Sequence, residues 1–338
     1  MLSTLDFKKV ADLFEDSLNG KDARTEDAPE KAFLTALGYL DDAGKPVATK
    51  VWSGLSKLLR HADTLDNLFA MPVPTMPGLY FFGAQRRTRP GVLTNYGGSG
   101  VAPNEAFERC LGEAVEHITS LSVEPGHHQT RSSSTGFASG KTLAHAQISA
   151  ANECLERHDL ARWFLSGAPL LALQPDKRLI SIASSLRRSR EPSIEFLLVL
   201  NENNPHNTVI AASEYCGELV TGYGCSPDIY DACLKAACEL GQGELGVQFE
   251  RQLPTSPPNG FLARSSHFRS LPHLLEADVS KTPDTLSGQR DSGPFANLGD
   301  FTFSDITSEE IGIPCVQAKN TKLRDVVLEV NEGDIGPL

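Results

Sequence analysis

Three stretches of the chain share one pattern of small, apolar and acidic positions. They begin at Gly100, Gly140 and Ser226 and read GVAPNEAFERCLGEAVEH, GKTLAHAQISAANECLER and SPDIYDACLKAACELGQG. In each stretch the seventh and eleventh positions are Ala or Cys and the fourteenth is Glu, and this spacing keeps them near one face of a helix. The pattern predicts three similar helices, each entered through a turn that contains Gly or Ser. Pro103 and Pro227 are expected just inside helix starts, where proline is tolerated.

Other parts of the pattern predict strands and loops around these helices. The runs PGLYFFGAQ, SIEFLLVLNEN, HNTVIAASEY and GELVTGYG are apolar and favour strands. Residues 251–300 are rich in Pro, Ser, Gly and Asp, which predicts long loops. We therefore expect a mixed α/β (α+β) fold, in which a mixed β-sheet packs against three similar helices bearing Ala and Glu. Two parts are expected: a helical segment over residues 1–70 and a domain over residues 71–338.

The acidic positions of the three helices carry the candidate chemistry. They lie on the same stripe as Ala and Cys, so they should face inward, where carboxylates are costly unless they are paired or bind a cation. Oxygen ligands suit Mg²⁺. A solvated helix surface is the alternative for any one helix, but the repetition in three helices favours a functional cluster. The residues at these positions are Glu113, Glu116, Glu153, Glu156, Glu239 and Gln242.

The segment Gly140-Lys141-Thr142 looks like the end of a nucleotide-binding P-loop, but its spacing argues against one. A P-loop needs four residues between its first glycine and the Gly-Lys pair, whereas Gly136 and Gly140 enclose only Phe137, Ala138 and Ser139. The polar segment before it predicts no buried strand. Lys141 is therefore expected either as a fixed cation beside the carboxylates or as an exposed lysine next to a loop.

Composition narrows the class of protein. The chain has 338 residues, a net charge of −12 and 40% hydrophobic residues, so a nucleic-acid backbone is not the expected partner. We expect no membrane span, no signal peptide and a cytoplasmic location. Seven cysteines without a C-x-x-C pair indicate reduced, buried thiols. Two arginine groups are interpreted either as solvated loops or as docking sites for an acidic partner: Arg86, Arg87 and Arg89, and Arg187, Arg188 and Arg190.

The three stretches resemble the YcaO family. The run STGFASGKTLAHAQISAANECLERHDLARWF looks like the family signature of a Gly-rich turn, then Ala, then E-x-x-E-R, and GEAVEH and ACELGQ match the first and third motifs. The resemblance covers residues 75–275. It implies a mixed α/β protein that activates a peptide amide oxygen with ATP, with Mg²⁺ held by the carboxylates. The products it implies are thiazolines, oxazolines, amidines or thioamides in ribosomally made peptides, bacteriocins included.

By this resemblance, the carboxylates of the first two helices would hold Mg²⁺ and act in catalysis together with Arg157. Glu239 and Gln242 of the third helix would contribute to cofactor binding. Arg264 and Arg269 lie in a segment similar to the family's C-terminal arginine-bearing segment and would reach a phosphate or a peptide carboxylate. Structural salt bridges are the alternative for these two arginines.

Four departures from the family pattern alter the expected charge of the site. Ser99 stands where the family usually has Lys, His117 where it has Arg, Lys141 where it has Asn and His145 where it has Glu. Lys141 and His145 would alter the charge close to the nucleotide and metal, because one positive charge is gained and one negative charge is lost. The expectation is a divergent member in which Lys141 and His145 tune the pocket, and which works without ATP.

Partners follow from the same resemblance. The chain is similar to the YcaO homologues of trifolitoxin-type pathways, where the YcaO protein is paired with a nitroreductase-like flavoprotein that modifies a short precursor peptide with it. We expect a homo- or hetero-oligomer that includes an FMN-carrying partner, a peptide-recognition subunit, or both. Two alternatives stay open: a standard ATP- and Mg²⁺-dependent azoline-forming cyclodehydratase, and a catalytically degenerate scaffold that only binds the peptide.

Overall fold

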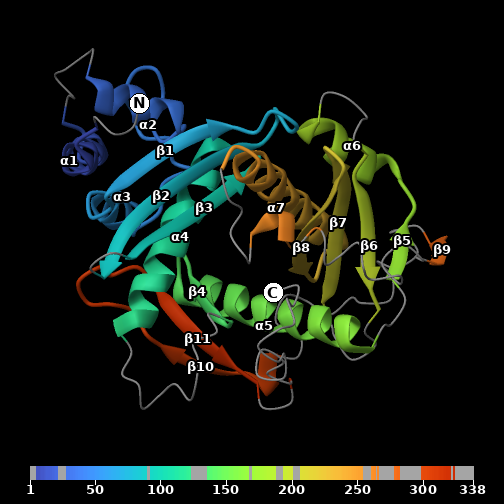
Figure 1. The fold of residues 1–338 in the computed structure, drawn as a ribbon. Coiled ribbons are helices and arrows are strands. Elements are labelled where there is room, and N and C mark those ends of the chain that lie inside the picture. Colours follow the sequence, from blue (N-terminus) through green and yellow to red (C-terminus); the bar gives the residue numbers. More distant parts are fainter. Residues whose placement is uncertain are drawn as a thin grey trace. The chain divides into compact units, whose positions relative to one another are not determined.

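A computed structural model describes most of the chain. The described residues are 5–21, 28–89, 92–122, 135–166, 170–187, 193–200, 206–253, 260–263, 265, 278–281, 298–320 and 323. The chain divides into two compact units: unit 1 is Met1–Pro72, Leu79–Ser149 and Ser304–Gln317, and unit 2 is Val73–Gly78, Ala150–Phe303 and Ala318–Leu338. Both units contain helices and strands (Figure 1), which confirms the predicted mixed α/β class.

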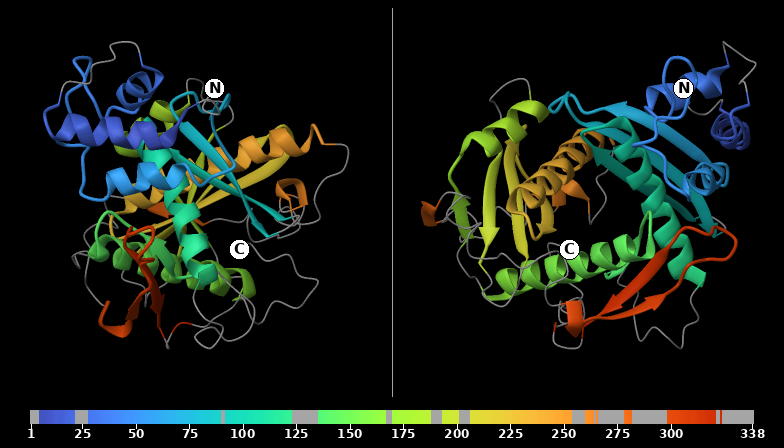
Figure 2. Two further views of the ribbon diagram at one scale, coloured as in Figure 1. Left: turned by 90° about the vertical axis from the view of Figure 1, so that its left-hand side faces the viewer. Right: turned by 180° about the vertical axis from the view of Figure 1, so that it is seen from behind.

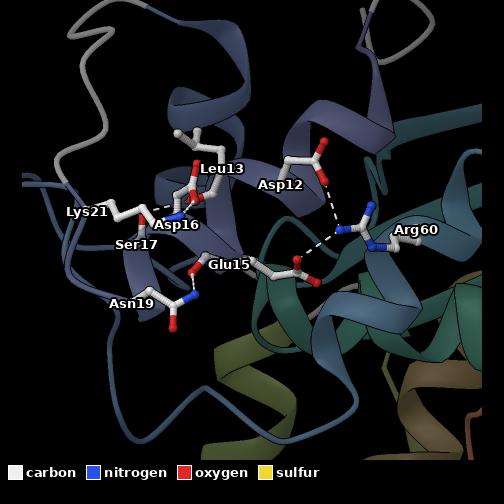
Figure 3. A network of polar contacts seen from close by, with 8 residues as sticks. All are labelled: Asp12, Leu13, Glu15, Asp16, Ser17, Asn19, Lys21 and Arg60. Carbon is white, nitrogen blue, oxygen red and sulfur yellow. Dashed lines mark hydrogen bonds and ion pairs between the residues drawn. The ribbon is translucent and has the colours of Figure 1, made fainter.

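Unit 1 begins with three helices: α1 (Phe7–Leu18), α2 (Pro29–Ala36) and α3 (Leu55–Ala62). The amphipathic pattern of α1 buries Val10 and Phe14 in a hydrophobic cluster shared with α2 and α3. On the outside, the Arg60 guanidinium of α3 contacts Asp12 at 2.8 Å and Glu15 at 2.9 Å, and so links α3 to α1 (Figure 3). That residues 1–70 form a helical segment of their own stays a prediction.

The main sheet of unit 1 is antiparallel, in the order β1-β2-β3. Its strands are β1 (Asn67–Pro72), β2 (Tyr80–Arg89) and β3 (Val92–Gly100). Helix α4 (Pro103–Ser122) follows β3 directly and packs along β3 and β2, as Figure 1 shows. The rings of Phe107 on α4 and Phe82 on β2 pack edge to face, with 5.4 Å between their centroids. Pro103 is the first residue of α4, as predicted.

A second, three-stranded sheet has the order β10-β11-β4. It contains β4 (Phe137–Ser139), β10 (Thr302–Asp305) and β11 (Cys315–Lys319), and β11 pairs antiparallel with β4. The short strand β4 leads into the turn before α5 (Leu143–Ser166). The expectation that no strand precedes this turn was wrong, because only the last three residues before Gly140 are needed for the pairing. The spacing argument against a P-loop is unaffected.

The sheet of unit 2 has the order β8-β7-β6-β5-β9, in which only β5 and β9 are parallel. The strands are β5 (Leu170–Leu173), β6 (Glu195–Val199), β7 (Asn207–Tyr215), β8 (Glu218–Ser226) and β9 (Asp278–Lys281). Helix α6 (Lys177–Leu186) packs against α7 (Ile229–Glu250), and α7 lies along β8 and β7 (Figures 1 and 2). A 3₁₀ helix covers Leu298–Asp300.

One strand–turn–helix element recurs with the same sequence alignment in both units. In unit 1 it is β3 followed by α4, and in unit 2 it is β8 followed by α7; β4 followed by α5 has the same order. The three helices predicted from the sequence pattern are therefore confirmed. Pro227 was placed wrongly: it precedes the N-cap Asp228, whose side chain accepts the first free N–H groups of α7 from Tyr230 and Asp231.

Several smaller predictions are settled by the structure. All seven cysteines are free thiols, five of them buried, with Cys154 half-buried and Cys216 exposed. No helix in the described part of the chain is long and apolar enough to cross a membrane. Arg187 is neither solvated nor available for docking, because it is buried against Glu244 and Ser213 in unit 2. Arg188, Arg190 and most of the stretch 251–300 lie outside the described residues.

Candidate functional site

In unit 1, close packing of α4 on β3 brings Glu113 to the strand backbone. A Cβ at Gly98 would stand 2.2 Å from the backbone nitrogen of Cys110 and 2.4 Å from the Ala106 carbonyl oxygen, so only glycine lets the helix approach this closely. The Gly97 N–H then donates to Glu113 Oε2 at 2.7 Å. Glu113 is exposed, so this hydrogen bond fixes its carboxylate at the surface of unit 1.

Glu116, one turn further along α4, is anchored in the same way to β4. It accepts a hydrogen bond from the Ser139 N–H at 2.7 Å. Burial of its carboxyl group raises its pKa to about 7, against the lowering effect of the Ser139 bonds and with a small rise from the Glu113 charge. The nearby thiols stay protonated, because burial raises the pKa of Cys110 and that of Cys315. Cys110 is therefore no nucleophile, as the sequence suggested.

His117, which stands at a family arginine position, takes part in a local pair. Its Nδ1 lies 3.1 Å from the hydroxyl of Tyr96 on β3, and burial lowers its pKa. A neutral imidazole that faces a phenol is a hydrogen-bonding group without a fixed charge. The position therefore does not supply the cation that an arginine would.

Lys141 lies on a different carboxylate from those expected. Its Nζ is 2.7 Å from Glu108 Oε2, and Glu108 also accepts a hydrogen bond from the buried Tyr39 hydroxyl at 2.8 Å. The ammonium also lies 6.0 Å from the centre of the Trp52 ring. Lys141 is thus a fixed cation, but it neutralises Glu108. His145 is exposed, and its backbone N–H donates to the Thr142 hydroxyl at the start of α5.

Unit 2 carries the second set of carboxylates on α5 and α7. Burial raises the pKa of Glu156 to about 8; the charges of Glu239 and Glu153 raise it further, and those of Arg157 and Lys235 lower it. Arg157 Nε lies 3.9 Å from Glu153 Oε1, one helical turn away. The pKa of Arg157 is raised mainly by Glu156, then by Glu153 and Glu239, against the effect of burial. The unit therefore holds an interacting group of three carboxylates with Arg157.

Glu239 is anchored to its strand by the same contact as Glu113. The Tyr223 N–H of β8 donates to Glu239 Oε2 at 3.0 Å. A Cβ at Gly222 would stand 2.1 Å from the Leu240 nitrogen, and one at Gly224 would stand 2.3 Å from the Ala232 carbonyl oxygen. These two glycines bring α7 down onto β8. Gln242 is half-buried one turn after Glu239.

The structure thus groups the predicted residues by unit. Glu113 and Glu116 lie in unit 1, and Glu153, Glu156 and Arg157 lie in unit 2 with Glu239. That the carboxylates of both units share one site stays a prediction. Arg264 and Arg269 lie outside the described residues.

Sequence reasoning missed four residues of these networks. Glu108 pairs with Lys141 and accepts a hydrogen bond from Tyr39. In unit 2 the charge of Lys235 acts on Glu156, and the Tyr223 N–H donates to Glu239. Lys235 could have been predicted from the sequence, because it lies one turn before Glu239 on a helix that the sequence pattern identified. Tyr39 was not, because its partner Glu108 is distant in sequence and only the tertiary fold joins them.

The donors suit Mg²⁺ in kind, because they are carboxylate oxygens. Their arrangement does not form a metal-binding site. Among the residues that the structure describes, no group of three or more His, Cys, Asp or Glu side chains is placed to hold a metal ion. Backbone N–H groups bind Glu113, Glu116 and Glu239. The described residues therefore do not by themselves fit a complete metal site.

Comparisons with known proteins place the chain in a family. Residues 113–319 match the family described as YcaO cyclodehydratase, ATP- and Mg²⁺-binding, and the chain belongs to this family. The match covers α4 from Glu113 onward, α5 and α7. No curated protein matches the chain in sequence.

Solved structures share the fold. The YcaO of Methanopyrus kandleri, solved with AMPPCP and Mg²⁺, is 19% identical with a TM-score of 0.61, and the match covers 83% of this chain and 92% of that one. A heterocyclase solved with substrate and cofactor is 14% identical with a TM-score of 0.62, and the match covers 80% of this chain. The chain spans about half the length of that heterocyclase, since 52% of it is covered.

Proposed function

We propose that the chain is the catalytic YcaO subunit that modifies a ribosomally made precursor peptide by activating backbone amides and closing rings with loss of water. The observation that carries the proposal is the strand-anchored carboxylate found twice, Glu113 on Gly97 and Glu239 on Tyr223, within a chain that belongs to a cyclodehydratase family. Groups held by rigid elements are suited to position a reacting ligand.

ATP and Mg²⁺ belong to the proposal as the family's cofactors. ATP would supply the driving force for removing water from the peptide. The structure weakens one reason for expecting activity without ATP, because Lys141 neutralises Glu108, and the described contacts do not place it on the proposed carboxylates. Support for the peptide as substrate comes from the fold shared with a heterocyclase solved with its substrate.

The test is incubation of the chain with the peptides encoded beside its gene, with and without ATP and Mg²⁺. Mass spectrometry should show the loss of one water per modified residue only when both are present, together with peptide-dependent release of ADP or AMP. Modification without ATP, increased by an added nitroreductase-like flavoprotein, would instead support the flavin-dependent alternative. Peptide binding without any mass change would support the scaffold.

Glu153→Gln separates catalysis from binding. The substitution keeps the side-chain shape and removes the charge that Arg157 faces at 3.9 Å. Product formation should fall by at least about a hundredfold, as for the loss of an electrostatic contact in an active site, while peptide affinity stays unchanged. Normal product formation by this variant would rule out a catalytic role for the carboxylates of unit 2.

A further inference from the structure

We propose that Lys235 is a built-in cation of the carboxylate cluster in unit 2, formed by Glu153, Glu156 and Glu239, and that it weakens the binding of a divalent ion there. The proposal deepens the proposed function and rests on it, because it concerns the carboxylates assigned to that activity.

The position of Lys235 is fixed by the packing of α7 on β8. Gly224 lies so close to the helix that a Cβ there would come within 2.8 Å of the Lys235 Cβ. The side chain is half-buried, and its Nζ donates to the carbonyl oxygen of Cys225 at 3.1 Å. An ammonium bound to a strand carbonyl is held in place, whereas a lysine on an open helix surface samples many rotamers.

This ammonium is held beside the carboxylates and not beside solvent alone. Glu239 follows Lys235 by one helical turn and is held by Tyr223 of the same strand, two residues before Cys225. The Lys235 charge also acts on the Glu156 carboxyl group, where it lowers the pKa against the effects of burial and of Glu239. The charges of two basic side chains, Lys235 and Arg157, therefore both act on the Glu156 carboxyl group.

The consequence for a metal follows from electrostatics. A divalent ion binds a carboxylate group most strongly when no other cation shares it, and each fixed positive charge a few ångströms away repels the ion. Lys235 and Arg157 leave this cluster with a net charge of −1 when all three carboxylates and both basic groups are charged. The cluster is then suited to a weakly held ion.

Unit 1 provides the matched control. Arg109 is the residue that aligns with Lys235 in the repeated element, and its Nη1 donates to the carbonyl oxygen of Ser99 at 2.8 Å. Arg109 is exposed, and in unit 1 the charge of Glu113 acts on Glu116. Removing Arg109 thus removes an equivalent strand contact without changing the charge balance in unit 2.

The experiment measures the affinity of the full-length chain for Mn²⁺ alone, from the electron paramagnetic resonance signal of the free ion, without peptide or nucleotide. Lys235→Met and Lys235→Gln should each bind Mn²⁺ about tenfold more tightly than the unsubstituted chain, an effect expected for removal of one nearby charge. Lys235→Arg should keep the original affinity, and so should Arg109→Met. Thermal unfolding confirms that each variant is folded.

Unchanged or weaker Mn²⁺ binding by folded Lys235→Met would overturn the proposal, and so would no measurable binding by any variant. Equal tightening by Arg109→Met would overturn it too, because the gain would then not be specific to the cluster of unit 2. These results are independent of peptide modification: a chain that gains Mn²⁺ affinity as expected but never modifies a peptide contradicts the proposed function and not this assignment.

Discussion

In unit 1 the helix α4 rests on β3 at Gly98, and in unit 2 the helix α7 rests on β8 at Gly224. Both contacts place a glutamate on a strand N–H, Glu113 on Gly97 and Glu239 on Tyr223. The charges around the two glutamates differ. In unit 1 the charge of Glu113 acts on the carboxyl group of Glu116, and Lys141 forms its ion pair with Glu108. In unit 2 the charges of Arg157 and Lys235 act on the carboxyl group of Glu156. One backbone device therefore supports two different charge arrangements.

The units also differ in how deeply they bury an ion pair, and this gives the largest expected effect. The side chains of Arg187 and Glu244 in unit 2 are 3% and 0% exposed, whereas those of Lys141 and Glu108 in unit 1 are 45% and 11% exposed. Arg187→Met should lower the free energy of unfolding by about 3–5 kcal/mol, because it leaves a buried carboxylate unpaired. Urea unfolding measures it. The double variant, Arg187→Met with Glu244→Met, should recover much of the lost unfolding free energy, because no buried charge is then left unpaired. If the double variant recovers nothing, packing and not charge is the cause of the loss.

The shared packing is tested by alanine at the two contact glycines. Gly98→Ala and Gly224→Ala should each cost about 2–4 kcal/mol, because the added Cβ meets backbone atoms that move only with the helix. Gly299→Ala is the control, since nothing lies within 4 Å of its Cβ, and it should stay within about 0.5 kcal/mol. A large cost in one unit and none in the other would break the equivalence of the two elements.

The ion pair of unit 1 should have a smaller effect. Lys141→Met should lower the free energy of unfolding by about 1 kcal/mol, because the ammonium is half-exposed and water replaces it in part. Tyr39→Phe leaves the same carboxylate without its buried hydroxyl partner and should cost a similar amount. Chemical unfolding of both single variants and the double variant measures their coupling. Strict additivity would contradict a shared network around Glu108.

The smallest effect is the pH dependence of stability in metal-free buffer. The pKa of Glu116 is raised to about 7 and that of Glu156 to about 8, so the folded chain holds these protons when the unfolded chain has lost them. This contribution to stability is complete below the ordinary carboxyl pKa and is lost as the pH rises through about 7 in unit 1 and about 8 in unit 2. The slope should stay below about 1 kcal/mol per pH unit, because both side chains are partly exposed.

Gln variants assign this pH dependence to the two units. Glu116→Gln should flatten the fall in unfolding free energy between the ordinary carboxyl pKa and about pH 7, and Glu156→Gln should flatten it over the same range and on to about pH 8, because an amide cannot lose a proton. Unfolding curves collected across this pH range give both slopes. If both variants keep the unsubstituted slope, the carboxyl groups are not the source of it.

Much of the fold was predictable because local pattern determines it. The spacing of Ala, Cys and Glu predicted α4, α5 and α7, and apolar β-branched runs predicted β2, β6, β7 and β8. The three-residue strand β4 was missed, because its pairing with β11 depends on residues 315–317, far along the chain. Helix α7 begins at Ile229, two residues after Pro227, where the sequence pattern predicted its first residue. The side chain of the N-cap Asp228 determines this start.

The site was predictable in part. Residue types and spacing identified the carboxylates, but the partner of each charge depends on tertiary contacts. Lys141 was expected beside the family carboxylates and lies on Glu108, because Tyr39 and Trp52 of the N-terminal segment complete its surroundings. Arg187 appeared as one of a group of surface arginines and is buried. No local sequence pattern distinguishes the half-exposed Lys141 from the buried Arg187, because both residues lie in polar stretches of the sequence.

The central claim is that the strand-anchored glutamates of the two units act in one reaction. The most direct measurement is peptide-dependent ADP release by Glu113→Gln, Glu239→Gln and the surface control Glu195→Gln, each checked for folding. The account predicts that the first two variants each lose at least about a hundredfold of the rate, while the control keeps it. Full activity in folded Glu113→Gln or folded Glu239→Gln would contradict the claim, because that glutamate would then serve packing alone.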